Sequence, residues 1–315
     1  MKNNNSILMI LVIALLGITS LTAQNTKDYG HRYDPPWDVL THEGTQFIGY
    51  GIDNAPDFHG NVNNPDLVVF FAGNQYMAVP ELLEAFKKAN PKYQRVFAET
   101  IPPGIEERQM KTGKLVLGNM IIDLKPDVIT AGKGSIVAKE KEGMFTKTAA
   151  YAQNKLAIMV KKGNPLNIKD LKDLERPDVL VSMPNPEWEG IGARIINAYE
   201  NTGGEKLSNA IMNDKVSKGT TYLTTIHHRQ TPMRIMYDES NAGPVWYSEA
   251  FYHSEMTNHP IDMVTLPDDI NVQATYVAGR MKNAPNPAAA DAFMDFLVSP
   301  KAKEIYKKYG FTTIE

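Results

Sequence analysis

Residues 151–174 read YAQNKLAIMVKKGNPLNIKDLKDL and predict a short buried strand at 157–160, followed by a Gly-Asn-Pro turn and the start of a helix. The tail at 286–311, NPAAADAFMDFLVSPKAKEIYKKYGF, predicts two successive helices. Asn286 and Ser299 are suited to be their N-caps, because each directly precedes a proline at the first helical position. Gly310 is suited to end the second helix.

Strands and helices alternate through most of the remaining chain. Apolar runs typical of buried strands occur at 67–72, 96–100, 127–130, 179–182 and 242–247. Helices are expected at 80–89, 104–111 and 190–200. This alternation predicts an α/β fold with mostly parallel sheets and helices on both faces.

The order of these pieces resembles that of a known family. A YAxNxLxxxVxxGNP passage at 151–165 is followed by a turn after VLVSM, by GPVWYSEA at 243–250, and by ATYVAGRM ahead of the helical tail. Over 67–311 the chain resembles the type II extracytoplasmic solute-binding proteins of ABC importers, most of all their molybdate-binding, or oxyanion, branch. The resemblance implies two α/β lobes, each a mostly parallel sheet flanked by helices, with a ligand cleft between them. The implied domains are lobe one at 61–151 and 268–315, and lobe two at 152–267.

The beginning of the chain is typical of a secretory signal peptide at 1–23. Lys2 precedes an apolar run at 7–18, and small residues at 19–23 suit a signal peptidase. The run is shorter than the roughly 20 residues that cross a bilayer as a helix, so we expect export to the periplasm rather than a retained anchor. Residues 24–60 show no periodicity and predict an irregular arm, which contains His31, His42 and His59.

Composition excludes several other classes of protein. The chain has no cysteine, which excludes a disulfide framework and a lipid attached through cysteine. Its net charge of −3, without a clustered basic surface, is not typical of a nucleic-acid-binding protein. No phosphate-binding glycine loop, zinc-protease motif or nucleophile elbow is present, so we expect no catalytic residue and no cofactor.

Loops at the carboxyl ends of strands are the expected ligand site, because helix N-termini offer free N–H groups there. Gly73 allows close backbone approach, while Asn74 and Gln75 offer amide groups. An equally simple interpretation of Asn74 is a helix cap that touches only water. The further candidates in loops of this kind are Thr100, Gly104, Lys133 and Trp188.

Two carboxylates flank Trp188. Because a carboxylate repels an oxyanion at short range, Glu187 and Glu189 are compatible with an oxyanion pocket only if they point outward, and the sequence leaves their direction open. If either points inward, a cation, a metal complex or an organic molecule with amine or hydroxyl groups becomes the better ligand.

A polar group at 227–229 supports two interpretations. In the first, Arg229 and a neutral His228 bind an anion, with the guanidinium as a bidentate donor. In the second, His227 or His228 joins Tyr247 and a carboxylate such as Glu187 in a metal site. The plainest alternative is a solvated basic loop.

The sequence therefore predicts a non-enzymatic periplasmic receptor that captures a small ligand by lobe closure and delivers it to an ABC permease in the inner membrane. An oxyanion such as molybdate, tungstate or sulfate is the first expectation for the ligand, and a metal ion or metal complex the second. A monomer is expected, with no nucleic-acid partner. The alternative from another class is a secreted metal-dependent hydrolase with Glu187 or Asp238 as its base.

Overall fold

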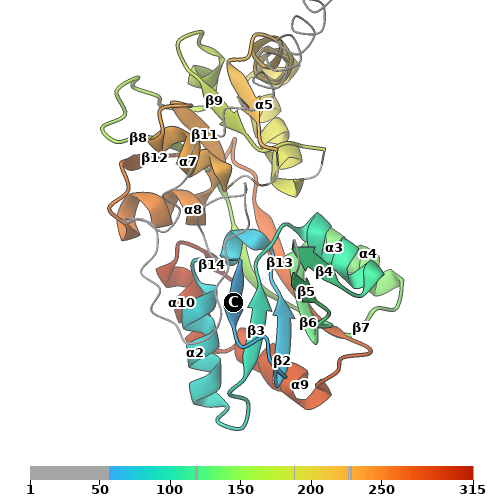
Figure 1. The fold of residues 1–315 in the computed structure, drawn as a ribbon. Coiled ribbons are helices and arrows are strands. Elements are labelled where there is room, and N and C mark those ends of the chain that lie inside the picture. The colour runs from blue at the N-terminus through green and yellow to red at the C-terminus, as the bar shows by residue number, and fades with distance from the viewer. Residues whose placement is uncertain (1–56, 118–119, 188, 226, 228, 315) are drawn as a thin grey trace, which may run out of the picture. The chain divides into compact units, whose positions relative to one another are not determined.

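A computed structural model describes residues 57–117, 120–187, 189–225, 227 and 229–314 of this protein. The predicted signal peptide, 1–23, and residues 24–56 of the predicted arm lie outside the described residues. Within the described part, the strands form a seven-stranded sheet, a five-stranded sheet and a two-stranded hairpin (Figure 1). No helix among these described residues is long and apolar enough to cross a membrane.

The seven-stranded sheet has the strand order β1-β3-β2-β6-β13-β7-β14. Its strands are β1 (Phe58–Gly60), β2 (Leu67–Phe70), β3 (Val96–Glu99), β6 (Val128–Gly132), β7 (Phe145–Asn154), β13 (Ala274–Met281) and β14 (Thr312–Thr313). The helices that belong to this first lobe are η1 (Gly73–Gln75), α2 (Val79–Ala89), α3 (Pro103–Thr112), α4 (Lys133–Lys141), α9 (Pro287–Leu297) and α10 (Pro300–Lys308). The hairpin consists of β4 (Leu115–Leu117) and β5 (Met120–Ile122).

The five-stranded sheet has the strand order β10-β9-β11-β8-β12. Its strands are β8 (Leu156–Lys161), β9 (Val181–Met183), β10 (Thr221–Leu223), β11 (Ala242–Trp246) and β12 (Ile261–Thr265). The helices of this second lobe are η2 (Leu171–Glu175), α5 (Gly190–Asn209), η3 (Ala210–Asp214), α6 (Lys215–Ser217), α7 (Gln230–Met236), α8 (Tyr247–Phe251) and η4 (Tyr252–Met256).

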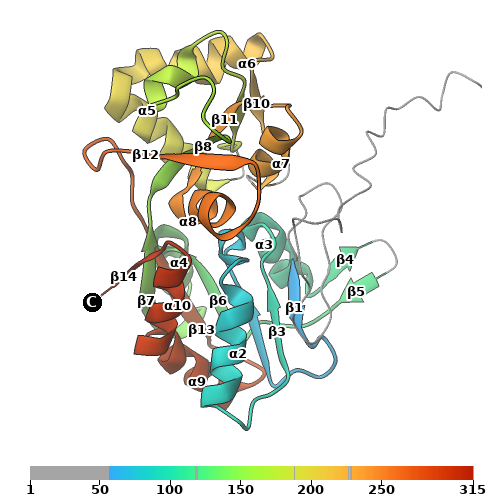
Figure 2. The ribbon, with the colours of Figure 1, turned by 90° about the vertical axis from the view of Figure 1, so that its left-hand side faces the viewer.

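Each sheet is covered by apolar clusters on both faces. Along β2, Leu67 and Val69 pack with α2, α9 and α10, whereas Val68 and Phe70 pack with α3, α4 and the hairpin. Side chains of a strand alternate between the two faces, so a continuous apolar run must be covered on both sides. Figure 2 shows α2 and α10 side by side on the first sheet. The predicted α/β architecture with helices flanking the sheets is confirmed.

The sheets are mixed, and the expectation of mostly parallel sheets is wrong. The β2–β3, β2–β6, β9–β10 and β9–β11 pairs are parallel, but β7, β8, β12 and β13 pair antiparallel with their neighbours. The chain leaves the first sheet through β7 into β8 and returns from β12 into β13. Strands that leave and re-enter a sheet run in opposite directions, and adjacent ones therefore pair antiparallel.

The chain changes sheets at two places, between Asn154 and Leu156 and between Thr265 and Ala274. The predicted lobe limits, at 151/152 and 267/268, stay a prediction. The predicted tail helices are present as α9 and α10. The Ser299 side chain caps α10 by accepting a hydrogen bond from Ala302 N at 3.3 Å, whereas Asn286 instead donates from its backbone to Asp127 Oδ1 at 2.6 Å.

Candidate functional site

A cavity of about 330 Å³ lies between the two lobes. Its first-lobe wall comes from η1, from the starts of α3 and α4, and from β13. Its second-lobe wall comes from the start of α5, from His227 and from β11. The lining residues are Ala72, Gly73, Asn74, Pro102, Pro103, Ala131, Gly132, Gly134, Ser135, Glu189, Gly190, Ile191, Arg194, His227, Trp246, Ala274 and Tyr276.

Two helices of opposite lobes begin at this cavity. Gly132 is the N-cap of α4 and Glu189 is the N-cap of α5, and neither helix start receives a hydrogen bond from an N-cap side chain. The first N–H groups of a helix have no partner within that helix, and the helix dipole places partial positive charge there. Both helix starts therefore favour an anion in the cavity.

Arg194 adds a full positive charge to this wall. It lies four residues after Gly190, so it projects from the same side of α5 as the helix start. A Cβ placed on Gly132 would lie 3.8 Å from Nη2 of Arg194, so the guanidinium reaches the opposite lobe. Among the described residues Arg194 has no hydrogen bond and no ion pair, in contrast to the buried Arg229. A guanidinium in this position is suited to bind an oxyanion.

Sequence reasoning missed Arg194. The signal was present, because a helix was predicted at 190–200 after a candidate binding loop, and position 194 lies one turn into that helix. A residue one turn after a ligand-facing helix start shares its face.

The two carboxylates of the 187–189 segment lie in different environments. Glu187 is exposed, whereas Glu189 is buried and lines the cavity. Glu189 Oε1 accepts hydrogen bonds from Asn185 N at 3.2 Å and from the hydroxyl of Thr224. The sequence left open whether Glu189 faces the ligand site; the structure places it in the cavity wall, where donors of its own lobe hold the carboxylate.

The structure brings only some of the predicted ligand residues to the cavity. Gly73 and Asn74 line it, and Asn74 Nδ2 donates to the Tyr276 hydroxyl at 2.6 Å. Gln75 is instead buried, where its Oε1 accepts from Tyr151 and Tyr306 at 2.9 and 2.7 Å. Four further candidates do not line the cavity: Thr100, Gly104, Lys133 and Tyr247. Trp188 and His228 lie outside the described residues.

The 227–229 segment has a structural arrangement that sequence reasoning did not anticipate. Arg229 is fully buried, forms an ion pair with Asp57, and does not line the cavity. His227 does line the cavity, and its Nδ1 accepts from the backbone N and the Nε of Arg229, each at 3.2 Å. A neutral imidazole that accepts at Nδ1 carries its hydrogen on Nε2. Nε2 lies beside Gly73, so His227 presents a donor at the junction of the lobes.

A metal site finds no support among the residues that the structure describes. No group of three His, Asp or Glu side chains there could hold a metal ion. Of the predicted metal ligands, His227 lies at the cavity, Tyr247 stacks on Phe251 with the ring centroids 6.0 Å apart, and His228 is not described. The metal interpretation stays a prediction.

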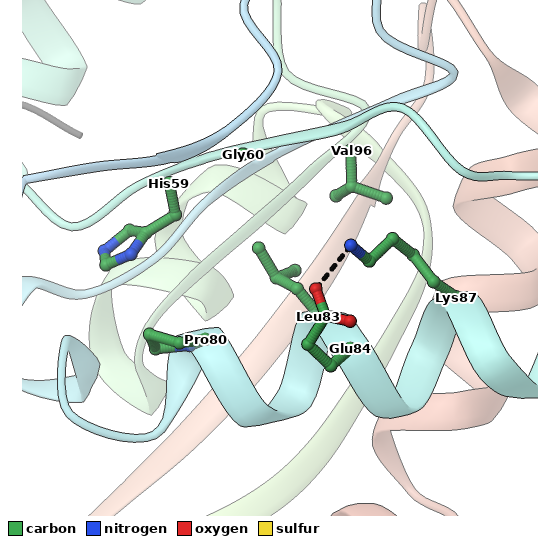
Figure 3. A pocket seen from close by; sticks show the side chains of 7 residues that line it. All are labelled: His59, Gly60, Pro80, Leu83, Glu84, Lys87 and Val96. Carbon is green, nitrogen blue, oxygen red and sulfur yellow. Dashed lines mark ion pairs between the residues drawn. The ribbon is translucent and has the colours of Figure 1, made fainter. Parts of the chain in front are cut away.

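A second, much smaller cavity of about 20 Å³ lies between α2 and the edge of the first sheet (Figure 3). On the side of the sheet, His59 and Val96 line this cavity. On the side of α2, Glu84 and Lys87 line it and form an ion pair with each other. His59 Nε2 lies 3.2 Å from the Thr100 hydroxyl. A cavity of this size has room for about one water molecule, which excludes it as the solute site.

Comparisons with known proteins match the predicted resemblance. The sequence model of a family described as bacterial extracellular solute-binding protein matches residues 67–312. The thiosulfate-binding protein of Escherichia coli is 26% identical over 261 residues, covering 72% of this chain and 73% of that protein. A molybdate-binding protein of Mycobacterium tuberculosis is 26% identical over 253 residues, covering 78% and 84% of the two chains.

Solved structures share the fold. The sulfate-binding protein of Mycobacterium tuberculosis has a TM-score of 0.65 at 19% identity and covers 79% of this chain and 86% of that one. The periplasmic molybdate-binding protein of Azotobacter vinelandii has a TM-score of 0.64 at 17% identity and covers 79% and 100%. The predicted two-lobed type II binding-protein fold is confirmed.

Proposed function

We propose, from the premise that this chain belongs to the bacterial extracellular solute-binding protein family, that it captures a small solute bearing an oxyanion group in the cavity between its lobes. Arg194 is the observation that carries the proposal. Its guanidinium lies between the starts of α4 and α5, and it has no partner among the described residues. An anion at that point would complete the hydrogen bonds of the guanidinium.

Relatives support the anionic class of solute. Those that match this chain are named for thiosulfate, sulfate and molybdate, which makes these three ions the first probes for the site. We further propose that the protein works in the periplasm as a monomer and delivers its solute to an ABC permease, without catalysing a reaction. Lobe closure would exclude water and strengthen each hydrogen bond to the anion.

A thermal-shift screen of salt-exchanged protein tests the proposal. An anionic solute should raise the melting temperature in proportion to the logarithm of its concentration, whereas divalent and ferric ions should not. The variant Arg194→Gln should weaken binding of that anion by about tenfold or more, as expected for loss of a charged hydrogen-bond donor.

Two variants serve as references. Lys301→Gln removes a positive charge on α10, outside the cavity lining, and should leave affinity unchanged. Lys133→Gln tests the residue that sequence reasoning favoured; it is exposed and not a lining residue, so a small effect is expected. Unchanged affinity in Arg194→Gln, or stabilisation by cations alone, would overturn the proposal.

A further inference from the structure

We infer that the solute is an organic anion, with a phosphate-, sulfate- or sulfonate-type group on a small carbon skeleton that also carries a hydroxyl or amine donor. The inference rests on the proposed function and deepens it, because it assigns the class of molecule that bears the oxyanion group. Three properties of the cavity carry it: its size, its apolar wall and the carboxylate of Glu189.

The cavity is too large for a bare tetrahedral oxyanion. Its volume is about 330 Å³, whereas roughly 10–15 Å³ on the same scale already holds one water molecule. Sites of about 300 Å³ and above are typical of small organic ligands. A single central atom with its oxygens would leave most of this space to water.

Further closure of the lobes would not remove this excess volume, because the lobes already touch around the cavity. A Cβ on Gly73 would lie only 2.8 Å from Nε2 of His227, which belongs to the other lobe. Nearby, the Tyr76 hydroxyl lies 2.9 Å from Nε2 of His253, again across the two lobes. Atoms in van der Waals contact or hydrogen bonds resist closer approach, so the cavity has about the size that its occupant must fill.

Part of the cavity wall is apolar. Ile191 and Trp246 of the second lobe and Ala72 and Ala274 of the first are buried, and all of them line the cavity. A hydrated inorganic ion gains nothing from such surfaces, but a carbon skeleton gains free energy by covering them. Trp246 has the largest of these side chains and packs edge-on to Tyr276, with ring centroids 6.2 Å apart.

Glu189 discriminates against a bare dianion. Its carboxylate lines the same wall as Arg194, so an ion that filled this region would meet one attractive and one repulsive charge. An organic anion can separate the two contacts along its length. Its oxyanion group would bind Arg194 and the start of α4, and a hydroxyl or amine would donate to Glu189.

Titration calorimetry with the whole protein tests the inference. The inorganic probes are sulfate, molybdate and phosphate; the organic probes are glycerol phosphate, phosphoethanolamine and phenyl phosphate; and glycerol and phenol are the uncharged controls. We expect at least one organic phosphate to bind about tenfold or more tightly than every inorganic ion, and the uncharged controls not to bind.

Three variants distinguish contacts to the carbon skeleton and its polar substituent from contacts to the oxyanion group. Ile191→Ala and Trp246→Phe should each weaken binding of the organic probe about threefold to tenfold and change that of inorganic phosphate by less than about twofold. Glu189→Gln should reduce the advantage of a hydroxyl- or amine-bearing probe over inorganic phosphate. Circular dichroism confirms that each variant is folded, and because the two apolar variants are independent, one remains informative if the other unfolds.

The outcomes distinguish this inference from the proposed function. Tight binding of an inorganic ion, with weaker binding of every organic probe and no effect of Ile191→Ala, overturns the inference but leaves an anion receptor. Binding of neither class, with the melting temperature unmoved by any anion, overturns both.

Discussion

Asp57 and Arg229 form an ion pair in which both side chains are essentially inaccessible to solvent, at 0% and 1% exposure, although 172 residues separate them in the sequence. Asp57 directly precedes β1 of the first sheet, and Arg229 directly precedes α7 of the second lobe. The guanidinium carbon also lies 5.2 Å from the centre of the Tyr76 ring. The pair therefore joins the two lobes beside the cavity and neutralises an arginine that sequence reasoning had assigned to the ligand.

Replacing Asp57 should destabilise the protein strongly. Asp57→Asn removes one partner of a buried ion pair, and breaking such a pair typically costs about 3–5 kcal/mol of unfolding free energy. Urea unfolding measures this loss. The double variant Asp57→Leu with Arg229→Met should recover part of it, because both charges are then removed. Equal stability of Asp57→Asn and the original protein would show that the pair contributes nothing.

Adding one methyl group at Gly73 should disturb the junction of the lobes. A Cβ there would lie 2.8 Å from both the His227 Nε2 and the Thr100 carbonyl oxygen, and the carbonyl belongs to the backbone and cannot rotate away. We expect Gly73→Ala to cost roughly 1–3 kcal/mol of unfolding free energy and to weaken solute binding in calorimetry.

Gly134→Ala is the matched control for that substitution. Gly134 also lines the cavity, but a Cβ there meets nothing within 4 Å, and it lies in the first turn of α4. Alanine is favoured over glycine in a helix by up to about 1 kcal/mol, so unchanged or slightly higher stability is expected. If the two alanine variants behave alike, close contact at Gly73 is not important.

The His253–His259 pair should make the protein less stable in acid. The two Nδ1 atoms lie 2.6 Å apart, and His253 Nε2 lies 2.9 Å from the Tyr76 hydroxyl. Burial, with a smaller effect of His259, lowers the pKa of His253 well below its usual 6.5. Below pH 6.5 the unfolded chain binds a proton that the folded protein excludes. The unfolding free energy therefore decreases as the pH is lowered, by up to about 1.4 kcal/mol per pH unit.

His253→Gln keeps a hydrogen-bonding side chain but removes this titration. Its unfolding free energy, measured in urea between pH 7 and 5, should decrease less steeply than that of the original protein. Parallel profiles for the two proteins would contradict the assignment of the acid sensitivity to His253.

Glu99 should produce the opposite slope. Burial raises the pKa of this carboxyl to about 8, the hydrogen bond from Gln109 opposes the rise, and the charge of Asp57 adds to it. Between pH 4.5 and 8 the folded protein holds a proton that the unfolded chain has lost, so the contribution of Glu99 to stability decreases as pH rises through this window and is constant above it. Glu99→Gln should therefore gain more stability at pH 8 than at pH 5, as urea unfolding can measure. An equal effect at both pH values would exclude a protonated Glu99.

The strands that the sequence predicted are those with continuous apolar runs, such as β2 and β8, because burial on both faces leaves a local signal. The strand β7 was missed, since polar and half-exposed residues occupy most of its length. It pairs with β13, more than a hundred residues later, and only that pairing gives it a defined conformation. Gly73 and Asn74 line the cavity, and their loop could be singled out from the sequence because it follows a recognisable strand; their part in binding remains a proposal.

The amino-acid sequence by itself determined the α/β class, the family and the loops from which a site could be built, because these depend on local periodicity and on the order of motifs along the chain. The tertiary structure alone decided which charges face the solute. Arg229 is neutralised by a carboxylate 172 residues away, while Arg194 and Glu189 are brought to the wall by the direction of one helix. Charges interact through space over a few ångströms, and the number of residues between two charges along the chain does not determine that distance.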